Sequence, residues 1–183
     1  MARLIIAIAA FTGIVSAVYF FVPIGRAEKD ELSFRKYRIA ADFPCRPKRT
    51  KDVIGSTETG EEISQTTLVC TQGGVVYSLS ATEYPEEALK TVSAEAWANR
   101  TLDGVRSQPN WTLKSSSQLS YQSFPAIRMH TLDSKAPPVE RTRLSVLTDA
   151  GTILIGVSWP SGSPEPSSST TFASSLTVTS VKK

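Results

Sequence analysis

The sequence predicts an α+β domain, with a mainly antiparallel β-sheet of about six to seven strands flanked by two helices, after an N-terminal hydrophobic leader. Most candidate strands are separated by short, turn-forming segments, which favours antiparallel hairpins over parallel crossovers. The candidate helices occur at two points and do not alternate with the strands. A hydrophobic content of 40% and a charged content of 20% indicate a packed globular domain rather than a disordered chain.

The leader is the most distinctive segment. Arg3 precedes an uncharged run from Leu4 to Val22, and Gly25-Arg26-Ala27 places small residues where leader peptidase requires them. This predicts a signal peptide over residues 1–27, cleaved after Ala27. The run is also long enough for an uncleaved membrane anchor over residues 4–22. In both cases Arg3 keeps the N-terminus inside, so the domain is exported to the periplasm or the extracellular space.

A single domain is predicted over residues 34–178, and its first half consists of strands. The predicted strands are Phe34–Phe43, Ile63–Thr71 and the alternating segment Val75–Thr82. Pro44 and Pro47 end the first strand because proline cannot donate to a ladder. The polar segment 48–60 is expected to be a loop, and Gly73-Gly74 a turn.

A helix follows, with Ser93 as N-cap and an apolar stripe of Ala94, Trp97, Ala98, Thr101, Leu102 and Val105. Four strands come next, over Trp111–Ser120, Ser123–Leu132, Val139–Leu147 and Thr152–Trp159. Ser163 and Pro164 suit the start of a second helix, which carries Phe172 and Ala173. The tail from Thr177 is expected to fray or to add a short strand.

Several short motifs resemble the PsbP-like fold family of small exported or extrinsic proteins. They are Phe43-Pro44 with Pro47, Tyr84-Pro85 before the helix, Phe124-Pro125-Ala126 at a strand start, Arg143 and Gly151 in the last hairpin, and Phe172 with Ser175-Leu176. The resemblance spans residues 34–178. It implies an antiparallel sheet flanked by helices, and an accessory role in binding larger partners. The family has no shared active site, so the resemblance implies no catalytic residue.

Cys45 and Cys70 are the two cysteines, and in an oxidising compartment such a pair is expected to form a disulfide. Two buried free thiols are the alternative. His130 is the one histidine, and Asp133 would point to the opposite face of the same strand, which argues against a Ser-His-Asp triad. These residues are too few for a zinc site, and no cofactor is expected. A small hydrolase or redox protein using Cys45, Cys70 or His130 is the alternative to a binding protein.

Basic residues are concentrated between Arg35 and Lys51, where seven cations face one acid. The chain after the leader is near neutral as a whole, which argues against a nucleic-acid binder, and outside this basic segment it has an acidic excess. The cations predict a contact surface for an anionic partner, either a membrane surface or an envelope protein, while a solvated surface is the alternative. The predicted contact residues are Lys36, Arg38, Arg46, Lys48, Arg49 and Lys51.

The sequence therefore predicts an exported binding or accessory protein without catalytic activity. A small-ligand carrier is a third possibility, because a helix packed on a sheet often leaves a groove. Asn99 and Asn110 each begin a glycosylation acceptor triplet, which matters only in a eukaryotic host. The sequence leaves the identity of the partner open.

Overall fold

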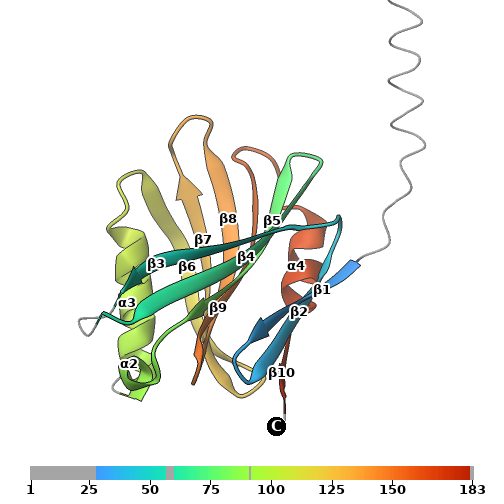
Figure 1. Ribbon diagram of the computed structural model, residues 1–183. Coiled ribbons are helices and arrows are strands. Elements are labelled where there is room, and N and C mark those ends of the chain that lie inside the picture. Colours follow the sequence, from blue (N-terminus) through green and yellow to red (C-terminus); the bar gives the residue numbers. More distant parts are fainter. Residues whose placement is uncertain (1–27, 57–59, 91, 182–183) are drawn as a thin grey trace, which may run out of the picture.

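The computed structural model describes residues 28–56, 60–90 and 92–181, and it confirms the α+β class (Figure 1). The first half contains β1 (Glu28–Phe34), β2 (Tyr37–Phe43), β3 (Lys48–Ser56), β4 (Glu62–Gln72), β5 (Val75–Glu83) and the short helix α2 (Glu86–Lys90). The second half contains α3 (Ala94–Arg106), β6 (Trp111–Tyr121), β7 (Phe124–Asp133), β8 (Val139–Thr148), β9 (Gly151–Pro160), α4 (Ser167–Ser174) and β10 (Thr177–Ser180).

The strands form two sheets, and every pairing between them is antiparallel. The larger sheet has seven strands in the order β3-β4-β5-β9-β8-β7-β6, and the smaller has three in the order β1-β2-β10. Neighbours in the larger sheet are joined by hairpins, except that β9 returns to pair with β5. The predominance of short connections is what the sequence predicted.

The large sheet is covered on both faces (Figure 1). One face packs against the small sheet and α4, and this main core includes Phe43, Leu79, Ile155 and Phe172. The other face packs against α3 through Trp97, Ala98, Leu102 and Val105, which contact Ile127 and Met129 of β7. Alternation along the strands supplies apolar side chains to both faces of β7, because successive residues point in opposite directions.

The predicted helix α3 is confirmed in its start and in most of its apolar stripe, but Ala94 of that stripe is exposed. The Ser93 side chain accepts a hydrogen bond from the backbone N–H of Ala96 at 3.1 Å, as an N-cap residue does. Trp97, Ala98, Leu102 and Val105 are buried. The hydroxyl of Thr101 donates to the carbonyl oxygen of Trp97 at 2.9 Å.

Three local predictions were wrong. The polar segment predicted as a loop contains β3, an edge strand whose residues are all exposed, so neither of its faces required apolar side chains. The predicted strand Phe34–Phe43 begins too early: the chain reverses at Arg35, which has a φ of 49°, so that the strand β2 starts at Tyr37. Phe34 instead ends β1, a strand that the sequence did not predict. Helix α4 begins at Ser167 after Pro166, and not at the predicted Ser163 N-cap.

Candidate functional site

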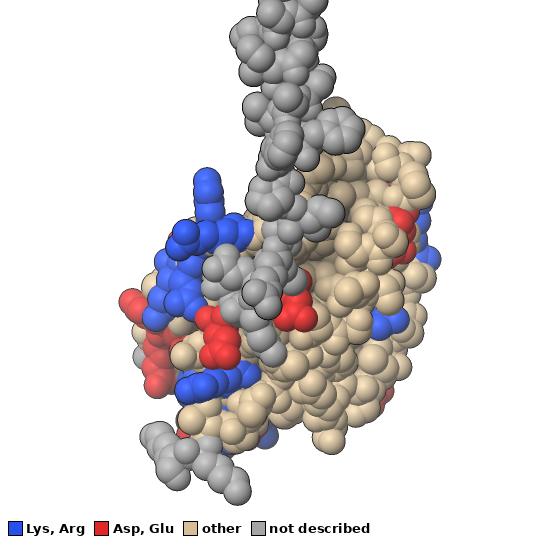
Figure 2. Space-filling view, turned by 90° about the vertical axis from the view of Figure 1, so that its right-hand side faces the viewer, with Lys and Arg blue, Asp and Glu red and all other residues tan. Residues whose placement is uncertain are grey.

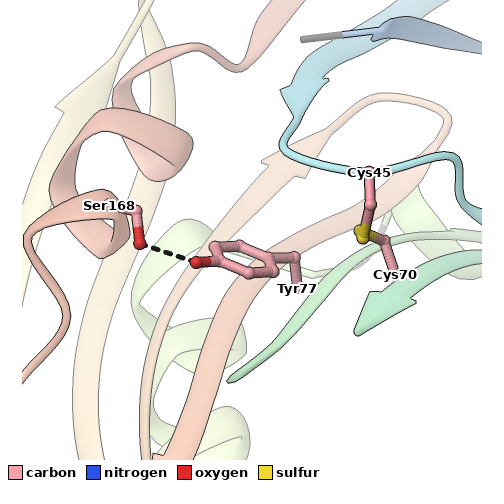
Figure 3. Close-up of a disulfide and its surroundings, with 4 residues drawn as sticks. All are labelled: Cys45, Cys70, Tyr77 and Ser168. Atoms are coloured by element: carbon pink, nitrogen blue, oxygen red, sulfur yellow. Dashed lines mark hydrogen bonds between the residues drawn. A yellow bond between two sulfur atoms is a disulfide. The ribbon is translucent and has the colours of Figure 1, made fainter. Parts of the chain in front are cut away.

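A disulfide joins Cys45, which follows β2, to Cys70 in β4, with their Cα atoms 5.9 Å apart (Figure 3). It therefore links the small sheet to the large one. Tyr77 lies opposite Cys70 in the register of β4 and β5, and its hydroxyl hydrogen-bonds the Ser168 hydroxyl of α4 at 2.6 Å. Both cysteines are consumed by the bond, so neither sulfur is a free nucleophile.

Four of the predicted contact residues lie together along the edge of the large sheet. Arg46, Lys48, Arg49 and Lys51 are all exposed, the last three within β3 itself. We call these four residues the basic rim. The register with β4 shows that Lys48 projects from one face of the sheet and Arg49 and Lys51 from the other, so the cations line an edge rather than a flat surface.

Three of the four rim cations form no ion pair among the described residues, although exposed Asp52 lies on the same strand. Arg49 donates to the backbone carbonyl of Glu31 in β1 at 2.6 Å, which also ties the two sheets together. Within the described part of the chain, Arg46, Lys48 and Lys51 form no ion pair. Figure 2 shows a cluster of basic side chains at the left margin of the view, with acidic side chains below it. Unpaired cations keep their full attraction for an external anion.

Two exposed apolar residues follow the rim on the same strand. Val53 and Ile54 are 59% and 52% exposed, and a register irregularity between Val53 and Gly55 lies at this point. Sequence reasoning missed this pair because it treated the segment as a loop. The available signal was an apolar dipeptide placed directly after a basic run.

Lys36 and Arg38 are placed differently from the rim. Lys36 lies in the turn before β2, at the opposite end of that strand from Cys45, and it pairs with Asp149. Burial alone would raise the pKa of Asp149, but hydrogen bonds from Lys36 and Tyr37 outweigh it and the pKa is lowered. Arg38 is exposed on β2 beside Thr179 of β10. The structure thus groups four of the six predicted residues.

His130 has a carboxylate partner that the sequence did not identify. Its Nε2 atom lies 2.7 Å from a carboxylate oxygen of Glu140, on the neighbouring strand β8. Burial alone would raise the pKa of Glu140, but the hydrogen bond from His130 and the charge of Lys114 lower it. Asp133 instead accepts two hydrogen bonds from Arg141, both at 3.0 Å.

Within the part of the chain that the structure describes, the His130–Glu140 pair has no third member of a hydrolytic triad. Among the described residues, no hydroxyl forms a hydrogen bond with His130. The described part of the chain also contains no group of three His, Cys, Asp or Glu residues that could hold a metal ion. Among the described residues, Glu140 therefore orients the His130 imidazole, but no serine or cysteine nucleophile is hydrogen-bonded to it.

The predicted leader, residues 1–27, lies outside the described residues. Within the described ranges, no helix has the length and apolar character needed to span a bilayer. Asn99 and Asn110 are both exposed, on α3 and directly before β6.

No protein-family model matches the chain, and no curated protein matches it in sequence. Among solved structures, a Pseudomonas aeruginosa protein of unknown function, PA94, described as a candidate regulator, matches with a TM-score of 0.38 and 6% identity. The match covers 73% of this chain and 84% of that protein. The resemblance to the PsbP-like fold family stays a prediction.

Proposed function

We propose that the chain is an exported, non-catalytic binding protein that docks on an anionic membrane surface through its basic rim and the adjacent Val53 and Ile54. The observation that carries this proposal is the exposed edge strand β3, which combines unpaired cations with the two most exposed large apolar side chains among the described residues. An edge strand usually carries charges to prevent strand-to-strand association, but protection alone does not call for exposed apolar residues.

The two kinds of residue would act by different forces. Each Lys or Arg near an anionic membrane contributes about 1 kcal/mol, and the attraction fades within a Debye length of about 8–10 Å. Apolar side chains contribute about 25 cal/mol for each Å² removed from water, and this term resists salt. An acidic envelope protein is the alternative partner, and the vesicle experiment below distinguishes it from a membrane.

Export is part of the proposal. Its support is the basic start, the uncharged run and the Gly25-Arg26-Ala27 site of the sequence. N-terminal sequencing of protein recovered from the periplasm or the medium should give Glu28, whereas an intact leader in the membrane fraction would identify the anchor. Protein retained in the cytoplasm would contradict both forms of export.

The docking surface is tested by co-sedimentation of residues 28–183 with vesicles of anionic or neutral lipid, at low and high salt. We expect binding to anionic vesicles only, weakened by salt. A Lys48→Ala/Lys51→Ala variant should bind at least about ten-fold more weakly, from the loss of about 2 kcal/mol. A Val53→Ser/Ile54→Ser variant should retain its salt dependence but bind more weakly.

The matched control is Arg128→Ala/Lys135→Ala, which removes the same charge from exposed positions on β7 and the loop after it, remote from β3 in the sheet order. It should bind as the parent does. If the control variant lost as much binding as the rim variant, net charge alone would explain the effect. Binding that is the same for anionic and neutral lipid, and the same in the rim variant, would refute the membrane proposal. An acidic protein would then be the partner to seek by crosslinking in the native host.

A further inference from the structure

Helix α3 covers only part of its face of the large sheet, and a groove remains beside it. The groove has a volume of about 550 Å³. Its walls come from α2, α3 and the segment between them, and its floor comes from β4, β5, β9 and β8. Clefts of a few hundred Å³ in which sheet and helix side chains converge are the usual size for small organic ligands.

The lining is divided into an apolar and a polar part. Trp97 and Val105 of α3 and Leu154 of β9 are among its apolar residues. Gln65, Thr82 and Ser145 are among the hydroxyl and amide groups of the floor. Two guanidinium groups also line the groove, that of Arg143 on β8 and that of the exposed Arg100 on α3. A pocket of this composition suits a ligand that is apolar over most of its length and polar at one end.

Arg143 is held in place by the surrounding structure. Its guanidinium carbon lies 4.3 Å from the centroid of the Trp111 ring. Its aliphatic part crosses Gly156, where an added Cβ would lie 3.1 Å from Cγ of Arg143. The glycine leaves room for the side chain to lie along the sheet, and the indole fixes its charged end by a cation–π contact.

Among the described residues Arg143 forms no ion pair of its own, and the Asp133 carboxylate acts on its charge only at longer range. Arg141 stacks on the same Trp111 ring at 4.8 Å, and it occupies the nearby Asp133 carboxylate with two hydrogen bonds. Among the described residues, Arg143 has neither an ion pair nor a side-chain hydrogen bond. Burial and the charge of Arg141 lower the pKa of Arg143 to about 10, so it remains a cation at neutral pH. Partial burial of a cation destabilises the fold unless a bound anion offsets the lost hydration of the charge.

The larger depression of about 930 Å³ nearby does not offer the same chemistry. Its cations are already engaged: Arg35 donates to the Tyr84 carbonyl oxygen, Lys36 pairs with Asp149, and Lys90 pairs with Glu87. The groove beside α3 is therefore the better candidate for binding an anion.

We propose that the groove beside α3 binds a single-chain anionic amphiphile, with its carboxylate or phosphate on the guanidinium of Arg143 and its apolar chain between α3 and Leu154. The guanidinium offers several N–H donors to an oxyanion in a planar arrangement. This site is independent of the basic rim, because it lies on a face of the sheet while the rim lies along the β3 edge.

The test is isothermal titration calorimetry of residues 28–183 with dodecanoate, dodecyl phosphate and 1-dodecanol, each below its aggregation concentration. The two acids should bind at least about ten-fold more tightly than the alcohol, since a hydrogen bond to a charged group is strong. Whichever acid binds more tightly identifies the head group. This comparison uses the unaltered chain, so it does not depend on the folding of a variant.

Arg143→Met keeps a long apolar side chain over Gly156 and removes the charge. It should reduce the affinity for the acids to that for the alcohol, while the alcohol itself binds as before. Arg128→Met, at an exposed site on β7, is the matched control and should leave all three affinities unchanged. Equal binding of acid and alcohol to the parent, or no binding of any of the three, would overturn the proposal. An Arg143→Met variant that still prefers the acids would also overturn it.

Discussion

The phenol of Tyr37 donates a hydrogen bond of 2.7 Å to the carboxylate of Asp149, a residue 112 positions further along the chain. Tyr37 begins β2 of the small sheet, and Asp149 lies in the turn between β8 and β9 of the large one. The bond therefore joins the two sheets at the end remote from the disulfide. Tyr37 is buried, and its ring also meets Phe124 edge-on with centroids 5.7 Å apart.

This bond predicts a loss of stability at alkaline pH. Burial, followed by the hydrogen bond to Asp149 and its negative charge, raises the pKa of Tyr37 to about 12 from an ordinary value of 10.0. A folded pKa above the unfolded value stabilises the fold fully below pH 10, and this contribution is lost as the pH rises toward 12.

The measurement is urea denaturation of residues 28–183 between pH 8 and pH 12, with phenolate absorbance recorded in parallel. Tyr37→Phe should be less stable than the parent at neutral pH and should show a smaller further loss in the alkaline range. Tyr84→Phe, for which no comparable side-chain hydrogen bond is present among the described residues, serves as the control. An identical alkaline loss in the parent and in Tyr37→Phe would show that another group is responsible.

The disulfide should contribute substantially to stability. Cys45 and Cys70 are separated by 25 residues, and closing a loop of that size lowers the entropy of the unfolded chain. We expect Cys45→Ser/Cys70→Ser to lose about 2–4 kcal/mol of unfolding free energy. Denaturation with and without a reductant provides the check, because the reductant should destabilise the parent and leave the double variant unaffected.

Two glycines should respond in opposite directions to alanine. Gly151, with a φ of +145°, begins β9, and an added Cβ would lie 2.0 Å from the Thr82 carbonyl oxygen. Gly151→Ala should therefore cost about 3 kcal/mol or more. Gly104 lies within α3 with no atom within 4 Å of the added Cβ, so Gly104→Ala should stabilise by about 0.5–1 kcal/mol. Urea denaturation measures both, and a stable Gly151→Ala variant would contradict this account of the β8–β9 turn.

Substitution of His130 should affect Glu140 but not binding. In His130→Ala the pKa of Glu140 should rise, because the hydrogen bond that lowers it is gone. A carboxylate with a lowered folded pKa stabilises the fold above its unfolded pKa, and that stability is lost as the pH falls. The variant should therefore lack part of this contribution above the unfolded pKa and should lose less stability than the parent as the pH falls. The pair is partly exposed, so its contribution at neutral pH should be no more than about 1 kcal/mol.

NMR titration of the Glu140 carboxyl carbon follows the pKa, and vesicle co-sedimentation follows binding. Binding by His130→Ala should equal that of the parent. A loss of binding with an unchanged fold would mean that His130 contacts the partner and would revive the reading in which this histidine is functional.

Local patterns predicted the elements that bury one apolar face. The alternation in Val75–Glu83 and the stripe of α3 were sufficient, because burial selects apolar residues at the period of each element. The same reasoning failed for β3, since an exposed edge strand bears no such pattern. The His130–Glu140 pair and the Arg143–Trp111 stack could not be predicted, because both depend on which strands become neighbours and in what register.

The basic rim illustrates the same limit. The sequence located all its cations, because they are consecutive or nearly so. It also grouped Lys36 with them, although the length of β2 separates Lys36 from Lys48 and Asp149 neutralises it. The partner of Lys36 lies 113 residues away in sequence, so no local pattern indicates it.

The return of β9 to β5 and of β10 to β2 has a consequence for how the domain acquires its structure. The first strands to be synthesised cannot complete either sheet until the last strands have been made. Hairpins among β3, β4 and β5 can form early, but the core between the sheets closes only with the arrival of the C-terminal segment. Non-local pairing of this kind slows folding.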